Sequence, residues 1–135
     1  REKINNELKE YENFKWLGPL QYPDKVREYL TEIDIYALIT GLDMAPHTIL
    51  EAQLMKKPVI ATNVGGIPEI IDNNETGILI PTENPSALIE SVNSLLIDDL
   101  KIKTLTENAY KFVLTNYSWD NLLDKYINFY KNLLE

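Results

Sequence analysis

Short apolar runs alternate with amphipathic segments along most of the chain, as in domains that pack helices around a parallel sheet. The apolar runs predict strands at 14–17, 33–39, 59–61 and 78–80. Helices are expected at 2–12, 24–31, 46–55, 68–71, 85–97, 99–115 and 118–134. The run at 33–39 is apolar enough for a strand buried on both faces. The pattern predicts an α/β fold, a Rossmann-like parallel sheet with helices on both faces and a ligand crevice beyond the carboxyl ends of the strands.

The sequence also predicts how the last three helices pack. The spacing of Leu88, Val92, Leu95 and Leu96 is helical, and these residues are expected in the core. Ser118 is suited to cap the last helix. The aromatic residues in and before that helix are expected to pack it onto the sheet: Tyr117, Trp119, Tyr126, Phe129 and Tyr130.

Composition narrows the range of functions. A net charge of −8 argues against nucleic acid and against a basic membrane-docking surface. The chain has no cysteine and one histidine, so disulfides, thiolate chemistry and a multi-histidine metal site are excluded. No apolar run is long enough to span a membrane, and the polar first residues do not form a signal peptide. A cytoplasmic protein is expected. Because the chain begins without methionine, we interpret it as part of a longer protein.

The segment GLDMAPHTILEAQLM places Asp43 before a predicted helix and Glu51 within it. The unpaired amides of a helix N-terminus attract phosphate, and a carboxylate can accept hydrogen bonds from the adjacent hydroxyls of a ribose. His47 falls in the first turn, where it could donate to a phosphate or sugar oxygen. The plainer alternative is that the two acids only complement the helix dipole and that His47 is a surface residue.

The segment PVIATNVGGIPEII predicts a strand, a turn at Gly65 and Gly66, and a short helix. Paired glycines allow a close backbone approach. The segment has neither of the common phosphate-binding glycine motifs. It is therefore either a tight connection or a loop whose amides face a ligand.

Taken together, these segments closely resemble the group 1 (family 4) retaining glycosyltransferases. The resemblance rests on Asp43-x7-Glu51-Ala, on PVIATNVGGIPEII and ETGILIP, on FKWLGPL and on the tail NYSW. It extends from about Phe14 to the C-terminus. It implies a two-domain GT-B fold of which residues 1–135 are an incomplete C-terminal, donor-binding domain. The first two βα units of that domain and the N-terminal acceptor domain would be missing.

The resemblance also implies roles for individual residues. Glu51 would hold the ribose hydroxyls of a UDP-, GDP- or ADP-linked sugar, and Asp43, the candidate catalytic residue, would lie near the donor sugar. Pro46, His47 and Thr48 would place helix amides beside the diphosphate or sugar, with Gly65 and Gly66 nearby. The acceptor would be a glycan or lipid held by the other domain. Neither a cofactor nor a metal is implied.

The sequence departs from the family pattern at three places. Asp43 stands where a longer glutamate is usual, and Ala45-Pro46 replaces a glycine-rich approach to the helix. Met55-Lys56 replaces Cys-Gly, so Lys56 must end a helix that glycine ends more easily. These changes leave room for a nucleotide-sugar-binding module without turnover.

A GT-B nucleotide-sugar epimerase is a further alternative. For the intact protein, the resemblance favours transfer of a sugar with retention in polysaccharide or glycolipid synthesis. That protein would be cytoplasmic or peripheral at the inner membrane face. The fragment alone is expected to be inactive.

Overall fold

The computed structural model describes residues 7, 8 and 10–134. Its sheet has three parallel strands in the order β1 (Tyr36–Leu38), β2 (Val59–Thr62) and β3 (Ile78–Ile80). Tyr36 pairs with Val59, and Ile60 pairs with Ile78. Every residue of β2 is buried, so β2 is the centre of the fold.

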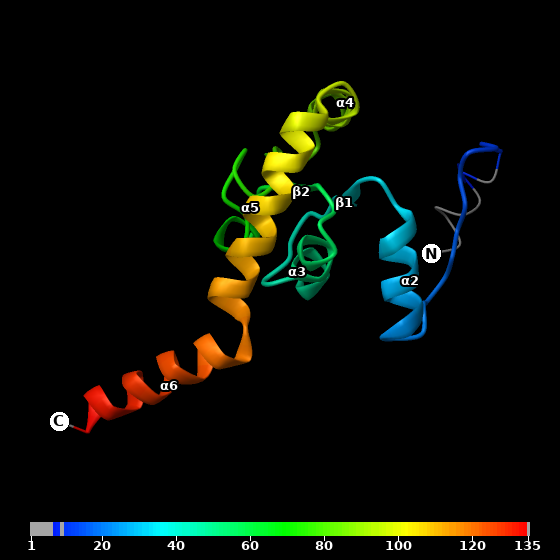
Figure 1. The fold of residues 1–135 in the computed structure, drawn as a ribbon. Coiled ribbons are helices and arrows are strands. Elements are labelled where there is room, and N and C mark those ends of the chain that lie inside the picture. The colour runs from blue at the N-terminus through cyan, green and yellow to red at the C-terminus, as the bar shows by residue number, and fades with distance from the viewer. Residues whose placement is uncertain (1–6, 9, 135) are drawn as a thin grey trace.

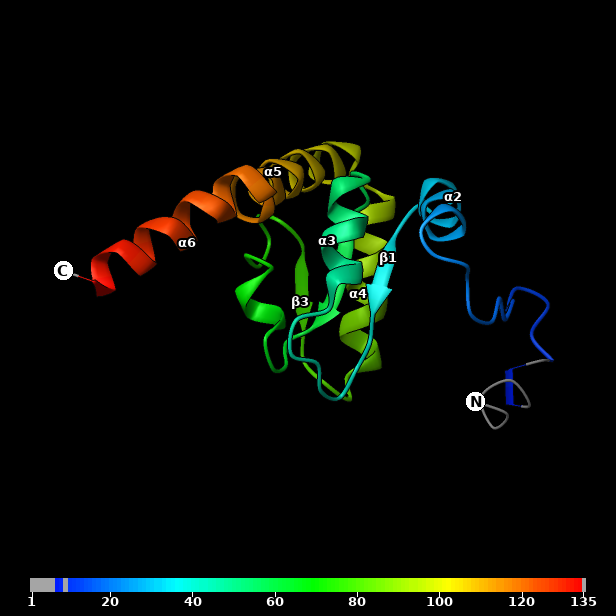
Figure 2. The same cartoon turned by 90° about the horizontal axis from the view of Figure 1, so that it is seen from below.

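Helices cover both faces of this sheet, as the sequence predicts. Side chains alternate along β2, so Val59 and Ala61 enter one core cluster and Ile60 enters the other. The first cluster lies under α3 (His47–Leu54) and the second under α4 (Pro85–Leu96). Figure 2 shows these two helices on opposite sides of the strands.

The remaining helices lie around the sheet or lead away from it (Figure 1). α2 (Asp24–Glu32) precedes β1 and buries Leu30 in the first cluster. A 3-10 helix, η1 (Ile67–Glu69), stands where a short helix is expected at 68–71. α5 (Asp99–Tyr117) packs mainly against α3, and α6 (Trp119–Leu133) follows it with Ser118 as the N-cap, as expected.

Two strand predictions require correction. Residues 14–17 form no strand, because no described strand lies beside them: the sheet starts at β1, and Figure 2 shows the chain before α2 away from it. The strand expected at 33–39 shrinks to Tyr36–Leu38 and is only partly buried, because among the described strands β1 pairs with β2 alone. Ile39 is 52% exposed. The helix expected at 2–12 falls largely outside the described residues.

Two packing predictions are also wrong. Leu95 is buried, but Leu96 lies on the outer side of α4 and is 64% exposed. α6 buries no residue and extends away from the sheet (Figure 1). Trp119, Tyr126, Phe129 and Tyr130 are therefore exposed, and only Tyr117 packs against the core.

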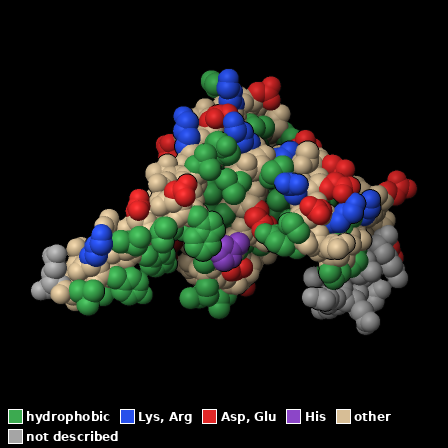
Figure 3. Space-filling model, turned by 60° about the horizontal axis from the view of Figure 1, so that its bottom comes forward, with side chains coloured by type: hydrophobic (Ala, Val, Ile, Leu, Met, Phe, Trp, Pro, Cys, Tyr) green, Lys and Arg blue, Asp and Glu red, His purple; other side chains and the backbone are tan. Residues whose placement is uncertain are grey.

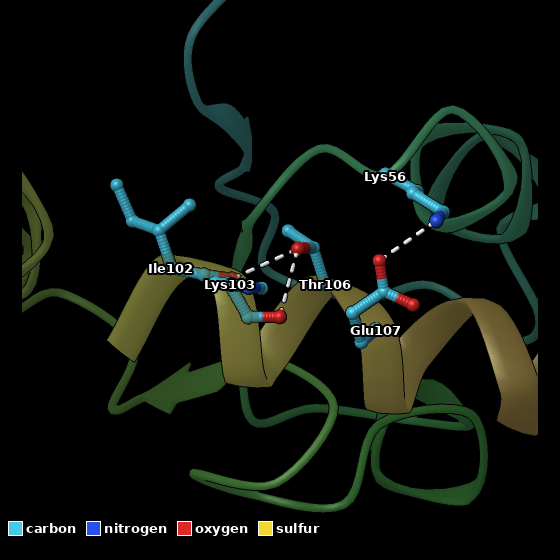
Figure 4. A network of polar contacts seen from close by, with 5 residues as sticks. All are labelled: Lys56, Ile102, Lys103, Thr106 and Glu107. Atoms are coloured by element: carbon cyan, nitrogen blue, oxygen red, sulfur yellow. Dashed lines mark hydrogen bonds and ion pairs between the residues drawn. The ribbon is translucent and has the colours of Figure 1, made fainter. Parts of the chain in front are cut away.

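The end of α3 shows how the chain replaces a glycine. Lys56 adopts φ of 52°, the left-handed conformation that ends a helix. The amide of Lys57 then donates to the carbonyl oxygen of Ala52 at 2.9 Å. The Lys56 ammonium is held by Glu107 at 2.7 Å (Figure 4). It also lies 4.9 Å from the ring centre of Tyr110. These contacts with α5 help to hold a conformation that is unfavourable for lysine.

Candidate functional site

The loops that follow β1 and β2 leave the same edge of the sheet and are tied together at their bases. The amide of Thr40 donates to the hydroxyl oxygen of Thr62 at 3.1 Å, and that hydroxyl donates to the carbonyl oxygen of Thr40 at 2.7 Å. Thr62 is buried. One buried hydroxyl thus acts as both donor and acceptor between the ends of β1 and β2. It therefore fixes the spacing between the first residues of the two loops.

Farther out, Asp43 and Met44 of the first loop lie directly against Gly65 and Gly66 of the second. The amide of Gly66 donates to the carbonyl oxygen of Asp43 at 3.0 Å. A Cβ atom on Gly65 would lie 1.9 Å from that same oxygen, and one on Gly66 would lie 1.6 Å from the carbonyl oxygen of Met44. The close approach expected of this glycine pair is therefore an approach between two protein loops. Because the Gly66 amide donates to Asp43, it is not free to bind a ligand.

The first loop leads into α3, whose start has an extended Pro46 as its N-cap residue and no side-chain cap. Pro46 was expected inside the helix; it lies one position before it and is buried. His47 and Thr48 form the exposed first turn. No side chain caps this end, and the amide of Ile49 donates to the carbonyl oxygen of Pro46 at 3.0 Å. The amides of His47 and Thr48 are the ones that can face solvent or an anionic ligand.

Glu51 lies one turn farther along α3 and lines a groove between α2 and α3. The groove has a volume of about 170 Å³, and its other walls come from Tyr22, Pro23, Val26, Arg27, Leu30, Leu54 and Met55. Glu51 itself is half-buried. Its carboxylate is an acidic group in an otherwise largely apolar hollow, which suits a ligand that presents both hydroxyls and a flat apolar surface.

The pKa of the Tyr36 hydroxyl responds to the charges of both acids, and sequence reasoning missed this residue. Burial raises the pKa of Tyr36; a hydrogen bond with the Thr48 side chain opposes this shift, and the negative charges of Glu51 and Asp43 add to it. A phenol on β1 therefore lies within electrostatic reach of the first turn of α3 and of both candidate acids. Inside the apolar run at 33–39 its sequence signal is only that of a core residue.

His47 lines a different hollow from the one that Glu51 lines. It lines an apolar hollow of about 350 Å³ together with Ala45, Leu50, Ile70, Tyr117, Trp119 and Leu122. Figure 3 shows the imidazole at the surface with hydrophobic side chains beside it. The structure thus brings Asp43 into contact with Gly65 and Gly66 and places Glu51 in the groove between α2 and α3. His47 borders the corner between α3 and the start of α6.

The described part of the chain offers no group of three acidic or histidine side chains that could hold a metal ion. Within the same residues, no helix combines the length and the apolarity needed to cross a membrane.

The sequence and the fold of the chain resemble those of known proteins. The family model of the glycosyl transferases group 1 matches residues 1–112. An uncharacterized glycosyltransferase of Methanocaldococcus jannaschii is 30% identical over 112 residues, which are 83% of this chain and 29% of that protein. The chain thus spans less than a third of the length of this relative.

Solved structures agree with the fold. A glycosyltransferase from Rickettsia africae superimposes with a TM-score of 0.81 at 31% identity, over 99% of this chain and 35% of its own. The Anabaena protein HepE, solved in complex with UDP, gives a TM-score of 0.85 at 19% identity, over 97% of this chain and 36% of its own. Given these matches and the two loops that meet beside α3, the chain belongs to the glycosyl transferases group 1 family.

Proposed function

We propose that this chain is the C-terminal, nucleotide-sugar-binding domain of a retaining glycosyltransferase with two Rossmann-like domains. In this proposal the N-terminal acceptor domain and the first two βα units of the donor domain lie outside residues 1–135. The short span relative to the family member from M. jannaschii supports this division. A sheet that begins at a half-exposed β1 supports it as well.

The observation that carries the proposal is the contact of Asp43 with Gly66 between two βα loops, just before the uncapped start of α3, with Glu51 one turn farther along that helix. A nucleotide-sugar combines a diphosphate with two sugars rich in hydroxyls. Helix amides suit the diphosphate, and carboxylates suit the hydroxyls. In our proposal the diphosphate lies at the first turn of α3, formed by Pro46, His47 and Thr48.

Glu51 then accepts hydrogen bonds from the ribose hydroxyls, with the nucleoside in the groove between α2 and α3. Asp43 accepts from a hydroxyl of the transferred sugar, and the loop at Gly65 and Gly66 holds Asp43 in position. The complexes of HepE with UDP and with UDP-glucose support a nucleotide-sugar as the donor.

In the proposed reaction, the acceptor hydroxyl oxygen bonds to the anomeric carbon on the face from which the diphosphate departs, so configuration is retained. The bond between the anomeric carbon and the phosphate oxygen breaks, and the proton of the acceptor hydroxyl passes to that oxygen. Preorganised amides at the start of α3 stabilise the charge that grows on the leaving diphosphate. The acceptor is a glycan or a lipid in polysaccharide or glycolipid synthesis.

Titration of this chain with UDP, GDP and ADP and their glucose conjugates, followed by ligand-observed NMR, tests the donor site. We expect one nucleotide to bind with a dissociation constant on the order of millimolar, about −4 kcal/mol, because part of the site lies outside the chain. Glu51→Gln removes this binding. Glu90→Gln changes the charge by the same amount on α4 and leaves binding intact. Equal binding by both variants would contradict the role of Glu51.

The stereochemistry of transfer needs the longer protein. NMR of the product formed from an α-linked donor distinguishes an α-linked from a β-linked sugar, and a β-linked product would refute retention. Isomerised nucleotide-sugar formed without an acceptor would identify an epimerase instead.

A further inference from the structure

Gln53 is a fully buried polar residue on α3, two positions after Glu51. Its exposed fraction is 0%. Its side-chain nitrogen donates to the carbonyl oxygen of Thr76 at 3.2 Å and to that of Ile70 at 3.5 Å. Its side-chain oxygen has no hydrogen-bond partner. One amide therefore joins α3 to two points of the segment that connects η1 to β3.

Stability alone does not account for this amide. A buried acceptor without a partner lowers the stability of the folded state, and it offsets much of what two long hydrogen bonds contribute. Methionine has nearly the same length and would fill the same space without an unpaired oxygen. We therefore explain the amide by its position: it fixes the backbone at Ile70 and Thr76 relative to α3.

The held segment leads directly back to the glycine loop. The amide of Ile70 donates to the carbonyl oxygen of Ile67, and the amide of Ile67 donates to that of Val64, at 3.0 and 3.1 Å. The amide of Glu69 donates to the carbonyl oxygen of Gly66 at 3.1 Å. Since Ile67 and Ile70 are also buried, a displacement at Ile70 is transmitted to Gly66 through a short, hydrogen-bonded path.

Gly65–Ile70 is thus attached to the unit that contains α3 at both of its ends. Gly66 is bonded to Asp43 before the helix, and Ile70 is bonded to Gln53 inside the helix. Two attachments leave a rigid segment only rotation about the line that joins them, whereas one would let it pivot in any direction.

We propose that Gln53 is a positioning residue of the donor site: by holding Ile70 and Thr76 it keeps the glycine loop pressed against Asp43. This inference rests on the proposed function for its consequence in ligand binding, but the attachment itself is testable without a ligand. Gln53 makes no contact with the donor in this scheme and acts only through the loop.

Gln53→Met tests the proposal, with Thr106→Val as the matched control. Thr106 is a buried hydroxyl on α5 that donates to the carbonyl oxygens of Ile102 and Lys103, away from the loops (Figure 4). Each variant loses one buried polar group at nearly constant volume, the amide of Gln53 or the hydroxyl of Thr106. Amide hydrogen exchange of Gly66 reports on the loop, and exchange of Ile60 on the central strand reports on the whole fold.

In Gln53→Met we expect Gly66 to exchange about tenfold faster relative to Ile60, the change that loss of one net hydrogen bond produces. The affinity for the bound nucleotide falls by a similar factor. Thr106→Val changes neither the exchange ratio nor the affinity. An unchanged ratio in Gln53→Met would overturn the attachment, and a changed ratio with unchanged affinity would overturn the role in the donor site.

Failure of the wild-type chain to bind any nucleotide would count against the proposed donor site. In that case the exchange ratio still decides whether Gln53 holds the loop, so the two failures are distinguishable.

Discussion

The amide of Gly66 donates to the carbonyl oxygen of Asp43 over 3.0 Å, so the main chain of Asp43 joins the two loops. Its carboxylate is not needed for that contact. The structural role and the proposed catalytic role of Asp43 therefore use different atoms of one residue. Substitutions of its side chain and of its neighbouring glycine are expected to separate the two roles.

Gly66→Ala should destabilise the fold. Its φ of −87° suits alanine, so the penalty comes from the added Cβ, which would lie 1.6 Å from the carbonyl oxygen of Met44. We expect a loss of about 1–3 kcal/mol in the free energy of unfolding, as for other overpacked sites. Gly41→Ala is the control, because nothing lies within 4 Å of its Cβ position. Urea denaturation of both variants measures the difference, and equal stabilities would contradict the clash.

Asp43→Asn should leave the fold intact and weaken sugar recognition. The carbonyl oxygen that bonds Gly66 is retained, so the free energy of unfolding should change by no more than about 0.5 kcal/mol. The proposed contact with the sugar loses its charge. Affinities for UDP and UDP-glucose, measured side by side, should differ less in the variant than in the wild type. An unchanged ratio of affinities would argue against a sugar contact.

Replacement of Lys56 isolates the cost of its backbone conformation. Both Lys56→Ala and Lys56→Gly remove the contacts with Glu107 and Tyr110, so they differ only in the cost of φ at 52°. The glycine variant should be more stable than the alanine variant by about 1 kcal/mol. Chemical denaturation of the pair provides the test, and a more stable alanine variant would show that the helix end rearranges.

The ion pair of Lys56 and Glu107 should give a small dependence of stability on acid pH. Its hydrogen bond, and then its charge, lower the pKa of Glu107 from the usual 4.5. The pair therefore contributes above the unfolded-state pKa, and this contribution is lost as pH falls through the lower folded-state pKa. Thermal midpoints of the wild type and Glu107→Gln should differ slightly at neutral pH and converge in acid. A difference that persists in acid would contradict this origin.

The aromatic face of α6 should be dispensable for folding. Trp119, Tyr126 and Phe129 are 84%, 60% and 59% exposed. Replacing any one of them by serine should change the free energy of unfolding by no more than about 0.5 kcal/mol, measured by urea denaturation. A large loss of stability would show that α6 folds back onto the core in solution.

The sequence predicts the elements around β2 well, because their signals are local. Apolar runs bounded by Pro58 or Pro81 identify strands, and Asn84, Asp98 and Ser118 each cap the helix that follows them. The order of elements and the helices on both faces follow from the same alternation.

Predictions failed where the outcome depends on neighbours that local patterns do not specify. Residues 14–17 have a strand's composition but no strand to pair with, and the aromatic residues of α6 have a core composition but no surface to cover. At the candidate site, motif spacing indicated Asp43 and Glu51. It did not reveal Tyr36 or Gln53, because a phenol and an amide inside apolar patterns are read as core positions.

The contact between the two loops determines which part of the chain can be exchanged with a relative without disrupting the site. Tyr36, Asp43, Glu51, Gln53, Gly66 and Thr76 all lie in one uninterrupted stretch of the chain, and their hydrogen bonds to the loops close within it. This stretch is therefore a natural unit of exchange between relatives. A chimaera that carries it whole transfers the donor-side chemistry together with its own scaffold, whereas a crossover between α3 and η1 would combine Asp43 and Gly66 from different parents and lose their fit.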